Sequence, residues 1–148
     1  MTKNNDLISQ LLEEEATYAK GGFIRDNNIR PRSFERDNLV LELPTKEKHN
    51  NGYGVLHGAV MYLLADTAAG ILCLALDQPS VTLSSNINFI SNVSEGSIFS
   101  STRIIHKGGK TSVIEVTIHD GKANTLAVGI YTMYRIHPPN GRHQKTSQ

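Results

Sequence analysis

The arrangement of apolar and polar residues along the chain changes its period near residue 80. From Gly58 to Leu76 almost every residue is apolar, and Asp66 carries the single charge. Such a run predicts a helix that is buried on nearly all sides within a globular fold. Beyond it, apolar and polar residues alternate, which is typical of half-buried strands. The alternation predicts four strands, at 81–90, 98–106, 112–119 and 126–136, with turns at Glu95-Gly96, Gly108-Gly109 and Asp120-Gly121.

The first of these strands is predicted to be a regular one, with a polar and an apolar face. A strict period of two separates its residues into two sets. One face then carries Val81, Leu83, Ile87 and Phe89, and the other carries Thr82, Ser84, Asn86 and Asn88.

The residues before the long helix predict fewer elements. Within the first 21 residues, a helix is expected over 5–20, stopped by a glycine pair. A short loop or strand then leads to one strand over 34–43. The stretch 45–56 is polar and rich in Gly and Asn, so it is expected to be a loop. At the other end of the chain, residues 138–148 are expected to form a disordered tail.

These elements together predict an α+β fold. Consecutive strands with short turns form an antiparallel meander, because parallel neighbours need crossover connections of about a dozen residues or more. The apolar face of the sheet needs a cover, and the helix from Gly58 is the one predicted element of sufficient size. We therefore expect a curved antiparallel sheet around one long central helix. The 148 residues fit a single domain, 1–148, since domains cluster near ~100–150 residues.

Charge and cysteine content narrow the class of protein. The formal net charge is +1, from 15 Lys and Arg against 14 Asp and Glu, whereas nucleic-acid binders usually concentrate positive charge. The single cysteine, Cys73, cannot form an internal disulfide and excludes a Cys-rich zinc module. The N-terminus lacks the apolar run of a secretory signal, and an aspartate at the centre of a membrane span would cost about 2.5–3.5 kcal/mol. We expect a cytoplasmic protein that binds neither nucleic acid nor membrane.

Two residues of the long helix indicate chemistry. Gly58 stands at its start, where backbone N–H groups and the positive end of the helix dipole can hold a developing oxyanion. Asp66 lies within the apolar run, and an acid there is costly unless it is paired or used. Desolvation should raise its pKa, which suits a general base or a nucleophile.

The spacing of these two residues predicts a dimer. Asp66 lies eight positions after Gly58, which is about 12 Å of helix rise. A reacting carbonyl must lie within ~3–3.5 Å of the group that attacks it, so one subunit cannot apply both groups to the same carbonyl. The carboxylate must then come from the antiparallel helix of a second subunit. Small residues would let that helix approach closely, namely Ala65, Ala68, Ala69 and Gly70.

Three segments of the chain resemble one protein family in combination. They are NNGYGVLHGA from Asn50 to Ala59, LADTA around Asp66 and VTLSSNINF from Val81 to Phe89. Together they resemble hotdog-fold acyl-CoA thioesterases, specifically the phenylacetate-pathway (PaaI-like) group, over roughly residues 35–136. The resemblance implies a sheet wrapped around a helix, homodimers that often pair into tetramers, and hydrolysis of an acyl-CoA thioester without a metal or other cofactor.

The resemblance also implies roles for individual residues. Asp66 is expected to be the nucleophile or general base, and the Gly58 amide the donor that polarises the thioester carbonyl. Asn51 is expected to orient the carbonyl or a water molecule, and Thr82 to position water. His57 is a further candidate, although a histidine at a helix start is more often a structural hydrogen-bonding residue than a proton carrier.

Two further features bear on the substrate. The resembling family usually has a second glycine after His-Gly where this chain has Ala59, and the added methyl group could narrow the site beside the carbonyl. Coenzyme A carries phosphates that call for Lys or Arg. The turn residues Lys107, Gly109 and Lys110 are the candidates to bind it. A second basic cluster is diluted by acidic neighbours and is read as solvated surface; it comprises Arg25, Arg30, Arg32 and Arg36.

Two other functions remain open at this point. One is a non-catalytic acyl-CoA-binding hotdog protein, such as the ligand domain of a regulator, although the first 34 residues show no paired helices with a basic face. The other is a hotdog dehydratase or hydratase, which would use a histidine with an acid. The sequence leaves open the acyl group, the choice between base and nucleophile for Asp66, and the choice between dimer and tetramer.

Overall fold

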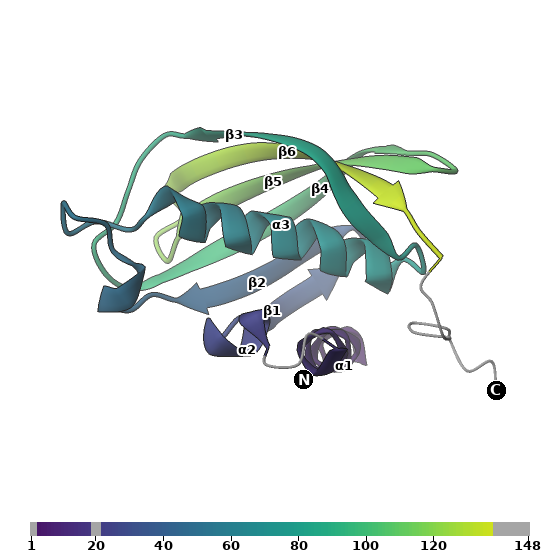
Figure 1. Cartoon of the computed structure of the whole chain (residues 1–148), viewed down its shortest axis with the longest axis horizontal. Helices are drawn as coiled ribbons and strands as arrows, with labels where there is room; N and C mark the ends of the chain where they lie inside the picture. The colour runs from purple at the N-terminus through teal and green to yellow at the C-terminus, as the bar shows by residue number, and fades with distance from the viewer. Residues whose placement is uncertain (1–2, 19–21, 138–148) are drawn as a thin grey trace.

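A six-stranded antiparallel sheet curls around one long helix, as a computed structural model of the chain shows (Figure 1). The structure describes residues 3–18 and 22–137. The central helix is α3, Gly58–Ala75. The strands are β1 (Arg30–Glu35), β2 (Asn38–Pro44), β3 (Ser80–Phe89), β4 (Ser97–Lys107), β5 (Thr111–Asp120) and β6 (Thr125–Arg135). The expected α+β class and the expected sheet around a central helix are confirmed.

The order of the strands differs from the expected four-strand meander. It is β1-β2-β4-β5-β6-β3, so that only β4, β5 and β6 form a meander. Strand β3 pairs with β6, the last strand, rather than with β4, and it forms one edge of the sheet. The reason is the helix, since α3 carries the chain along the concave face from β2 to the far edge. The segment after β3 then returns to pair β4 with β2.

The region before α3 contains more structure than its pattern predicts. The single strand expected over 34–43 is a hairpin of β1 and β2, which pair with each other. Arg36 takes a left-handed backbone conformation at the turn, with φ of 56°, which is uncommon for a residue other than glycine. A short helix, α2 (Phe23–Asp26), precedes β1. The expected loop over 45–56 holds a 3-10 turn, η1 (Glu47–His49).

A bulge in β3 overturns the two-faced strand that strict alternation predicts. The register with β6 shifts between Thr82 and Ser84, and a bulge of this kind moves the following side chains to the other face. Thr82 and Ser85 therefore both point towards α3, where each contacts a helix residue. Val81 and Leu83 remain 49% and 61% exposed. The apolar residues at the start of β3 do not face the core.

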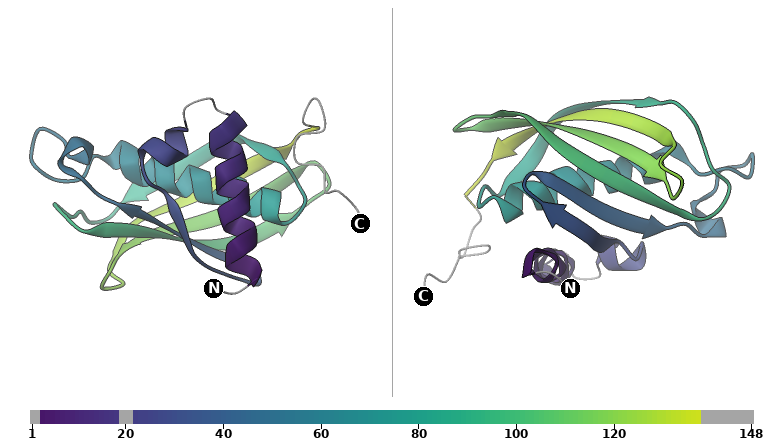
Figure 2. Two further views of the ribbon diagram at one scale, coloured as in Figure 1. Left: turned by 90° about the horizontal axis from the view of Figure 1, so that it is seen from below. Right: turned by 180° about the vertical axis from the view of Figure 1, so that it is seen from behind.

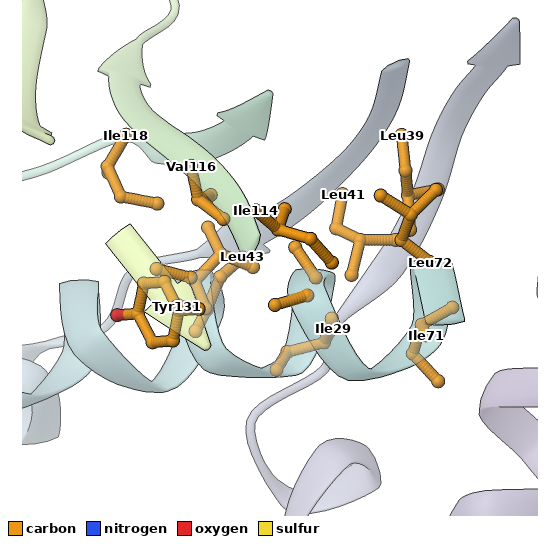
Figure 3. Close-up of a cluster of buried hydrophobic side chains, with 14 of the residues drawn as sticks. Ile29, Leu39, Leu41, Leu43, Ile71, Leu72, Ile114, Val116, Ile118 and Tyr131 are labelled. Atoms are coloured by element: carbon orange, nitrogen blue, oxygen red, sulfur yellow. The ribbon is translucent and has the colours of Figure 1, made fainter. Parts of the chain in front are cut away.

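The core lies between α3 and the concave face of the sheet (Figure 3). Its side chains are mostly aliphatic, as Leu41, Leu72 and Ile118 illustrate. Helix α1 (Lys3–Tyr18) adds Ile8 and Leu12 to this core and contacts β1 and α3, which it crosses in Figure 2. The expected N-terminal helix is thus confirmed over its described residues, whereas the expected tail over 138–148 lies outside them.

Burial accounts for the apolar character of α3. Within the described residues, it is the one helix long and apolar enough to cross a membrane. Eight of its residues are buried inside the chain, from Met61 to Cys73. A helix that packs against a sheet in this way has an apolar composition without any membrane.

The depth of this core predicts the cost of truncating it. Ile118 is 0% exposed on β5, whereas Ile105 on β4 is 48% exposed. We expect Ile118→Ala to lower the free energy of unfolding by about 2–5 kcal/mol, because it removes buried methyl groups and leaves a cavity. The matched substitution Ile105→Ala should cost less than about 1 kcal/mol. Urea denaturation of both variants checks this, and equal losses would show that the sheet does not pack as described.

Candidate active site

Three contacts join α3 to the edge strand β3, and together they form a contact line: Asp66 with Thr82, Tyr62 with Ser85, and Gly58 with Phe89. Near the middle of α3, the Thr82 hydroxyl donates a hydrogen bond of 2.5 Å to Asp66 Oδ1. Tyr62 lies one turn closer to the helix start, and its hydroxyl is 2.5 Å from that of Ser85. The helix residues of the line are four positions apart, and residues so spaced lie on one face of a helix. The sequence therefore places Tyr62 beside Asp66.

The third contact lies at the start of α3. Gly58 has no side chain, and a Cβ built there would lie 3.1 Å from Cζ of Phe89. The aromatic ring of Phe89 consequently rests against the backbone of the first helical residue. Phe89 is nevertheless 53% exposed, so its outer surface remains free.

The amides at the start of α3 differ in what they bind. His57 Nδ1 accepts a hydrogen bond of 3.0 Å from the Ala59 N–H, and the His57 carbonyl accepts one of 2.9 Å from the Val60 N–H. The Gly58 N–H has no partner within the described part of the chain. It is therefore available to a ligand at the positive end of the helix dipole.

Asp66 has one carboxylate oxygen held and one available. The side chain is half-buried, and Oδ1 accepts the Thr82 bond, while Oδ2 has no hydrogen-bond partner among the described residues. Thr82 Oγ1 also lies 3.7 Å from Met133 Sδ. Two of the predicted site residues, Asp66 and Thr82, are thus in direct contact, and the Oδ2 atom can take a proton or attack a carbon.

Asn51 is occupied by its own loop. Its Oδ1 accepts hydrogen bonds from the N–H groups of Tyr53, at 2.9 Å, and Val55, at 3.4 Å. This is the local arrangement that Asn commonly makes in turns. Of its side chain, the amide nitrogen is the group that remains to orient a ligand.

The basic residues predicted to bind coenzyme A lie at the other end of α3 from Gly58. Lys107, Gly109 and Lys110 surround the turn between β4 and β5, at the end of the molecule where α3 finishes (Figure 1). Lys107 is close enough to Cys73 to lower the pKa of its thiol, against a larger rise caused by burial. One chain therefore does not bring these lysines to its own Gly58.

The second basic cluster is largely engaged with carboxylates. Arg25 Nη2 lies 2.7 Å from Glu13 Oε1, and Arg32 Nε lies 3.2 Å from Glu42 Oε2. Arg30 Nε is 3.9 Å from the same oxygen of Glu42. These ion pairs support the prediction of a surface role.

The dimer argument expected the small residues of α3 to face a partner helix. Most of them do not face outward. Ala65, Ala68 and Ala69 are each 0% exposed and pack inside their own chain. Gly70 is half-buried, with no atom within 4 Å of the position of an added Cβ. Half-buried residues recur at helical spacing along α3, namely Leu63, Thr67, Gly70 and Leu74, and of these Leu63 and Leu74 pack against the edge of the core.

Sequence reasoning missed Tyr62, Ser85 and Phe89. The four-residue spacing from Gly58 through Tyr62 to Asp66 is a signal that could have found the tyrosine. No comparable signal exists for Ser85, because the bulge that turns it towards the helix is a feature of strand pairing.

One family model matches the chain. It describes the thioesterase superfamily and covers residues 53–127, which is half of the chain. The chain belongs to this superfamily. Its reaction class is therefore thioester hydrolysis, and the family expected from the sequence motifs is confirmed.

Relatives and solved structures agree with this membership. The 1,4-dihydroxy-2-naphthoyl-CoA hydrolase of Escherichia coli is 27% identical over 114 residues, 75% of this chain and 84% of that protein. The structure of the E. coli PaaI protein, from the phenylacetic acid degradation operon, is 22% identical and has a TM-score of 0.76 over 88% of this chain and 96% of its own. It shows that the hotdog fold is shared. The smu.793 protein of Streptococcus mutans, solved with acetyl CoA, is 27% identical and has a TM-score of 0.70 over 74% and 89%.

A buried histidine anchors the loop that leads into α3. His49 is 5% exposed; its Nδ1 accepts a 2.9 Å hydrogen bond from the Lys46 N–H, and its Nε2 lies 3.1 Å from Asn27 Oδ1. Its carbonyl accepts the His57 N–H at 2.9 Å. Burial, followed by the charges of Lys48 and Lys46, lowers the pKa of His49. The folded protein therefore holds this ring neutral.

This predicts a loss of stability in mild acid. Because the pKa is lower in the folded than in the unfolded chain, the unfolded chain binds more protons below about pH 6.5, and stability falls as the pH drops through that range. We expect His49→Gln to be less stable than wild type at pH 8 but to lose less stability between pH 7 and pH 5. Melting temperatures measured across this range check it, with His137→Gln, at an exposed position, as control. An unchanged slope in His49→Gln would contradict the assignment.

Proposed function

We propose that this thioester hydrolase acts on acyl-CoA thioesters, with Asp66 as its general base or nucleophile and the Gly58 amide as its oxyanion donor. The observation that carries the proposal is the state of Asp66. One oxygen is fixed by Thr82, and the other has no partner within the described chain. An acid held in orientation, half-buried and with one oxygen available, is suited to catalysis. In this scheme the reaction needs no metal or other cofactor.

The chemistry follows one of two balanced routes. As a base, Asp66 Oδ2 takes a proton from water while the water oxygen bonds to the thioester carbon. The carbonyl electrons move onto oxygen, where the Gly58 N–H stabilises them. When the carbonyl reforms, the C–S bond breaks and the CoA thiolate takes the proton from Asp66. As a nucleophile, Oδ2 itself bonds to the carbon and expels the thiolate, and water then hydrolyses the anhydride.

Both routes place the two groups on different chains. Gly58 and Asp66 of one helix are about 12 Å apart along its axis, so the proposal includes a homodimer in which each site takes Gly58 from one chain and Asp66 from the other. The edge strand supports it, because one side of β3 pairs with no other strand among the described residues, and exposed edges pair readily with another strand. This edge also exposes apolar side chains, namely Val81, Leu83, Phe89 and the adjacent Ile90.

The proposed substrate class rests on relatives and on charge. The E. coli relative is named as a hydrolase of a CoA thioester, and the S. mutans protein was solved with acetyl CoA. We propose that Lys107 and Lys110 contact the phosphates of coenzyme A. An antiparallel partner helix would bring the partner's Gly58 towards the half of α3 that lies near this turn. Pairing of dimers into a tetramer and a cytoplasmic location are parts of the same proposal.

His57 argues against a dehydratase. Its Nδ1 is used as the cap of α3, where it accepts the Ala59 N–H. A catalytic histidine paired with an acid would need Nδ1, or the other ring nitrogen Nε2, to face the carboxylate. This bond gives His57 the structural role at the helix start that is common for such a histidine.

Loss of the carboxylate should abolish most activity. We expect wild type to release thiol from members of an acyl-CoA panel, and Asp66→Asn to be slower by about 10²–10⁴-fold, because general-base loss alone has that effect. The amide keeps the shape of the side chain and its acceptor for Thr82. Asp77→Asn, at an exposed position just after α3, is the control and should keep full activity. Wild-type activity in Asp66→Asn would remove Asp66 from the mechanism.

Mixing two damaged proteins tests the shared site. Gly58→Pro removes the amide donor and also shifts the adjacent ring of Phe89, while proline is accepted in the first turn of a helix. When it is mixed with Asp66→Asn, about half of the dimers contain one chain of each kind, and in these one site carries both defects and the other neither. Activity should recover to about a quarter of the wild-type level per chain. Differently tagged chains verify subunit exchange, and exchange without recovery would place both groups on one chain.

A further inference from the structure

The peptide group that joins Leu56 to His57 is hydrogen-bonded at both of its polar ends. Its carbonyl oxygen accepts a bond of 3.0 Å from the side-chain amide of Asn92, and its N–H donates one of 2.9 Å to the carbonyl of His49. One partner lies before α3 and the other after β3. Because a peptide group is planar and rigid, bonds at its two ends fix the orientation of its plane.

The next peptide group along the chain carries the proposed oxyanion donor, the Gly58 N–H. The two groups share the Cα of His57, which has φ of −67° and ψ of 133°. The carbonyl of the second group accepts the Val60 N–H in the first turn of α3, whereas its N–H has no partner among the described residues. With the first group held, rotation at the His57 Cα is restricted. The direction of the Gly58 N–H is restricted with it.

The side chain of Asn92 is itself held in one orientation. Its Oδ1 accepts a hydrogen bond of 2.8 Å from the Val93 N–H, so its Nδ2 is the end that remains for the Leu56 carbonyl. The carbonyl of Val93 in turn accepts the Leu56 N–H at 2.8 Å, and Val93 packs against the core. Asn92 is an exposed residue, so its contribution to the fold is a hydrogen bond and not core packing.

We infer that Asn92 is a positioning residue, whose side-chain amide sets the direction of the Gly58 N–H by holding the peptide group before it. This inference rests on the proposed function, in which the Gly58 N–H stabilises the oxyanion. A donor of this kind acts where charge develops in the transition state, and its effect depends on being aimed at that position. Asn92 contacts neither the substrate nor the reacting atoms in this scheme and acts through the backbone.

Loss of the Asn92 bond should lower kcat and leave KM nearly unchanged. Asn92→Ala removes the donor, and Asn92→Asp removes it while keeping the shape of the side chain and an acceptor for the Val93 N–H. The substrate is the member of an acyl-CoA panel that wild type hydrolyses fastest. We expect kcat to fall by about tenfold in both variants, less than the ~10²–10³-fold that follows loss of an oxyanion donor itself. KM should change by less than about twofold, because the affected interaction strengthens in the transition state.

The Gly58 amide can also be observed without any substrate. In protein labelled with ¹⁵N-glycine, each of the 12 glycines contributes one amide signal, and the Gly58 signal is the one missing from Gly58→Pro. An amide signal responds to the orientation of its peptide group. We therefore expect the Gly58 signal to shift in Asn92→Ala.

Thr45→Val is the matched control. The Thr45 hydroxyl donates to the carbonyl of Gly96, four positions after Asn92, and the Thr45 N–H donates a second bond of 3.0 Å to the same oxygen. The substitution removes one side-chain hydrogen bond to the segment after β3 without affecting the bonds of the peptide group before Gly58. It should lower the melting temperature about as much as Asn92→Ala does, and leave kcat and the Gly58 signal unchanged.

Four results would overturn the inference while hydrolysis itself persists. They are an unchanged kcat in both Asn92 variants, a rise in KM in place of the fall in kcat, an unchanged Gly58 signal in Asn92→Ala, and an equal fall of kcat in Thr45→Val. If wild type hydrolyses none of the CoA thioesters, the proposed function fails and the inference falls with it.

Discussion

An aspartate in the middle of an apolar helix needs a hydrogen-bond partner, and the partner that Asp66 has organises the site around it. Thr82 supplies a hydroxyl from the edge strand, so that edge must lie alongside α3 rather than diverge from it. The bulge after Thr82 then turns Ser85 towards Tyr62 and ends the strand with Phe89 against Gly58. Without the bulge, Thr82 and Ser85 would face opposite sides of the sheet. One irregularity in a strand thus aligns the whole contact line.

The three backbone N–H groups at the start of α3, those of Gly58, Ala59 and Val60, differ in whether they have a hydrogen-bond partner among the described residues. His57 caps the helix by binding the Ala59 N–H through its ring and the Val60 N–H through its carbonyl. These bonds stabilise the helix end, which would otherwise leave several donors unsatisfied. They leave the Gly58 N–H without a partner in the described part of the chain, at a residue against which the ring of Phe89 packs. A residue with a side chain at this position would have to displace that ring, which gives a packing reason for glycine in addition to the proposed role of its amide.

Much of the architecture could be predicted from the sequence. The period of α3 and the alternation in the strands after residue 97 reflect how much of each element is buried, and burial is written into the residue types. The errors occurred where pairing between distant segments decides the outcome. β3 pairs with β6 because α3 carries the chain to the far edge of the sheet. The alternation of residues within a strand does not indicate which other strand it will pair with. The hairpin at Arg36 was missed because its turn lacks glycine and proline, the residues by which such turns are usually found.

The candidate site, too, could be predicted from the sequence only in part. The sequence by itself determined that the acid Asp66 lies in an apolar helix that begins at Gly58, because composition and helical spacing are local properties. It also determined that the two groups are too far apart along one helix to act on a single carbonyl. Only the tertiary structure decided which hydroxyl holds Asp66, which helix amide remains available, and that Ala65, Ala68 and Ala69 face inward. It alone revealed that the Tyr131 hydroxyl has no hydrogen-bond partner among the residues that the structure describes. These features depend on contacts between residues far apart in the chain, and such contacts follow from the packing of the helix against the sheet, which no local pattern of residues specifies.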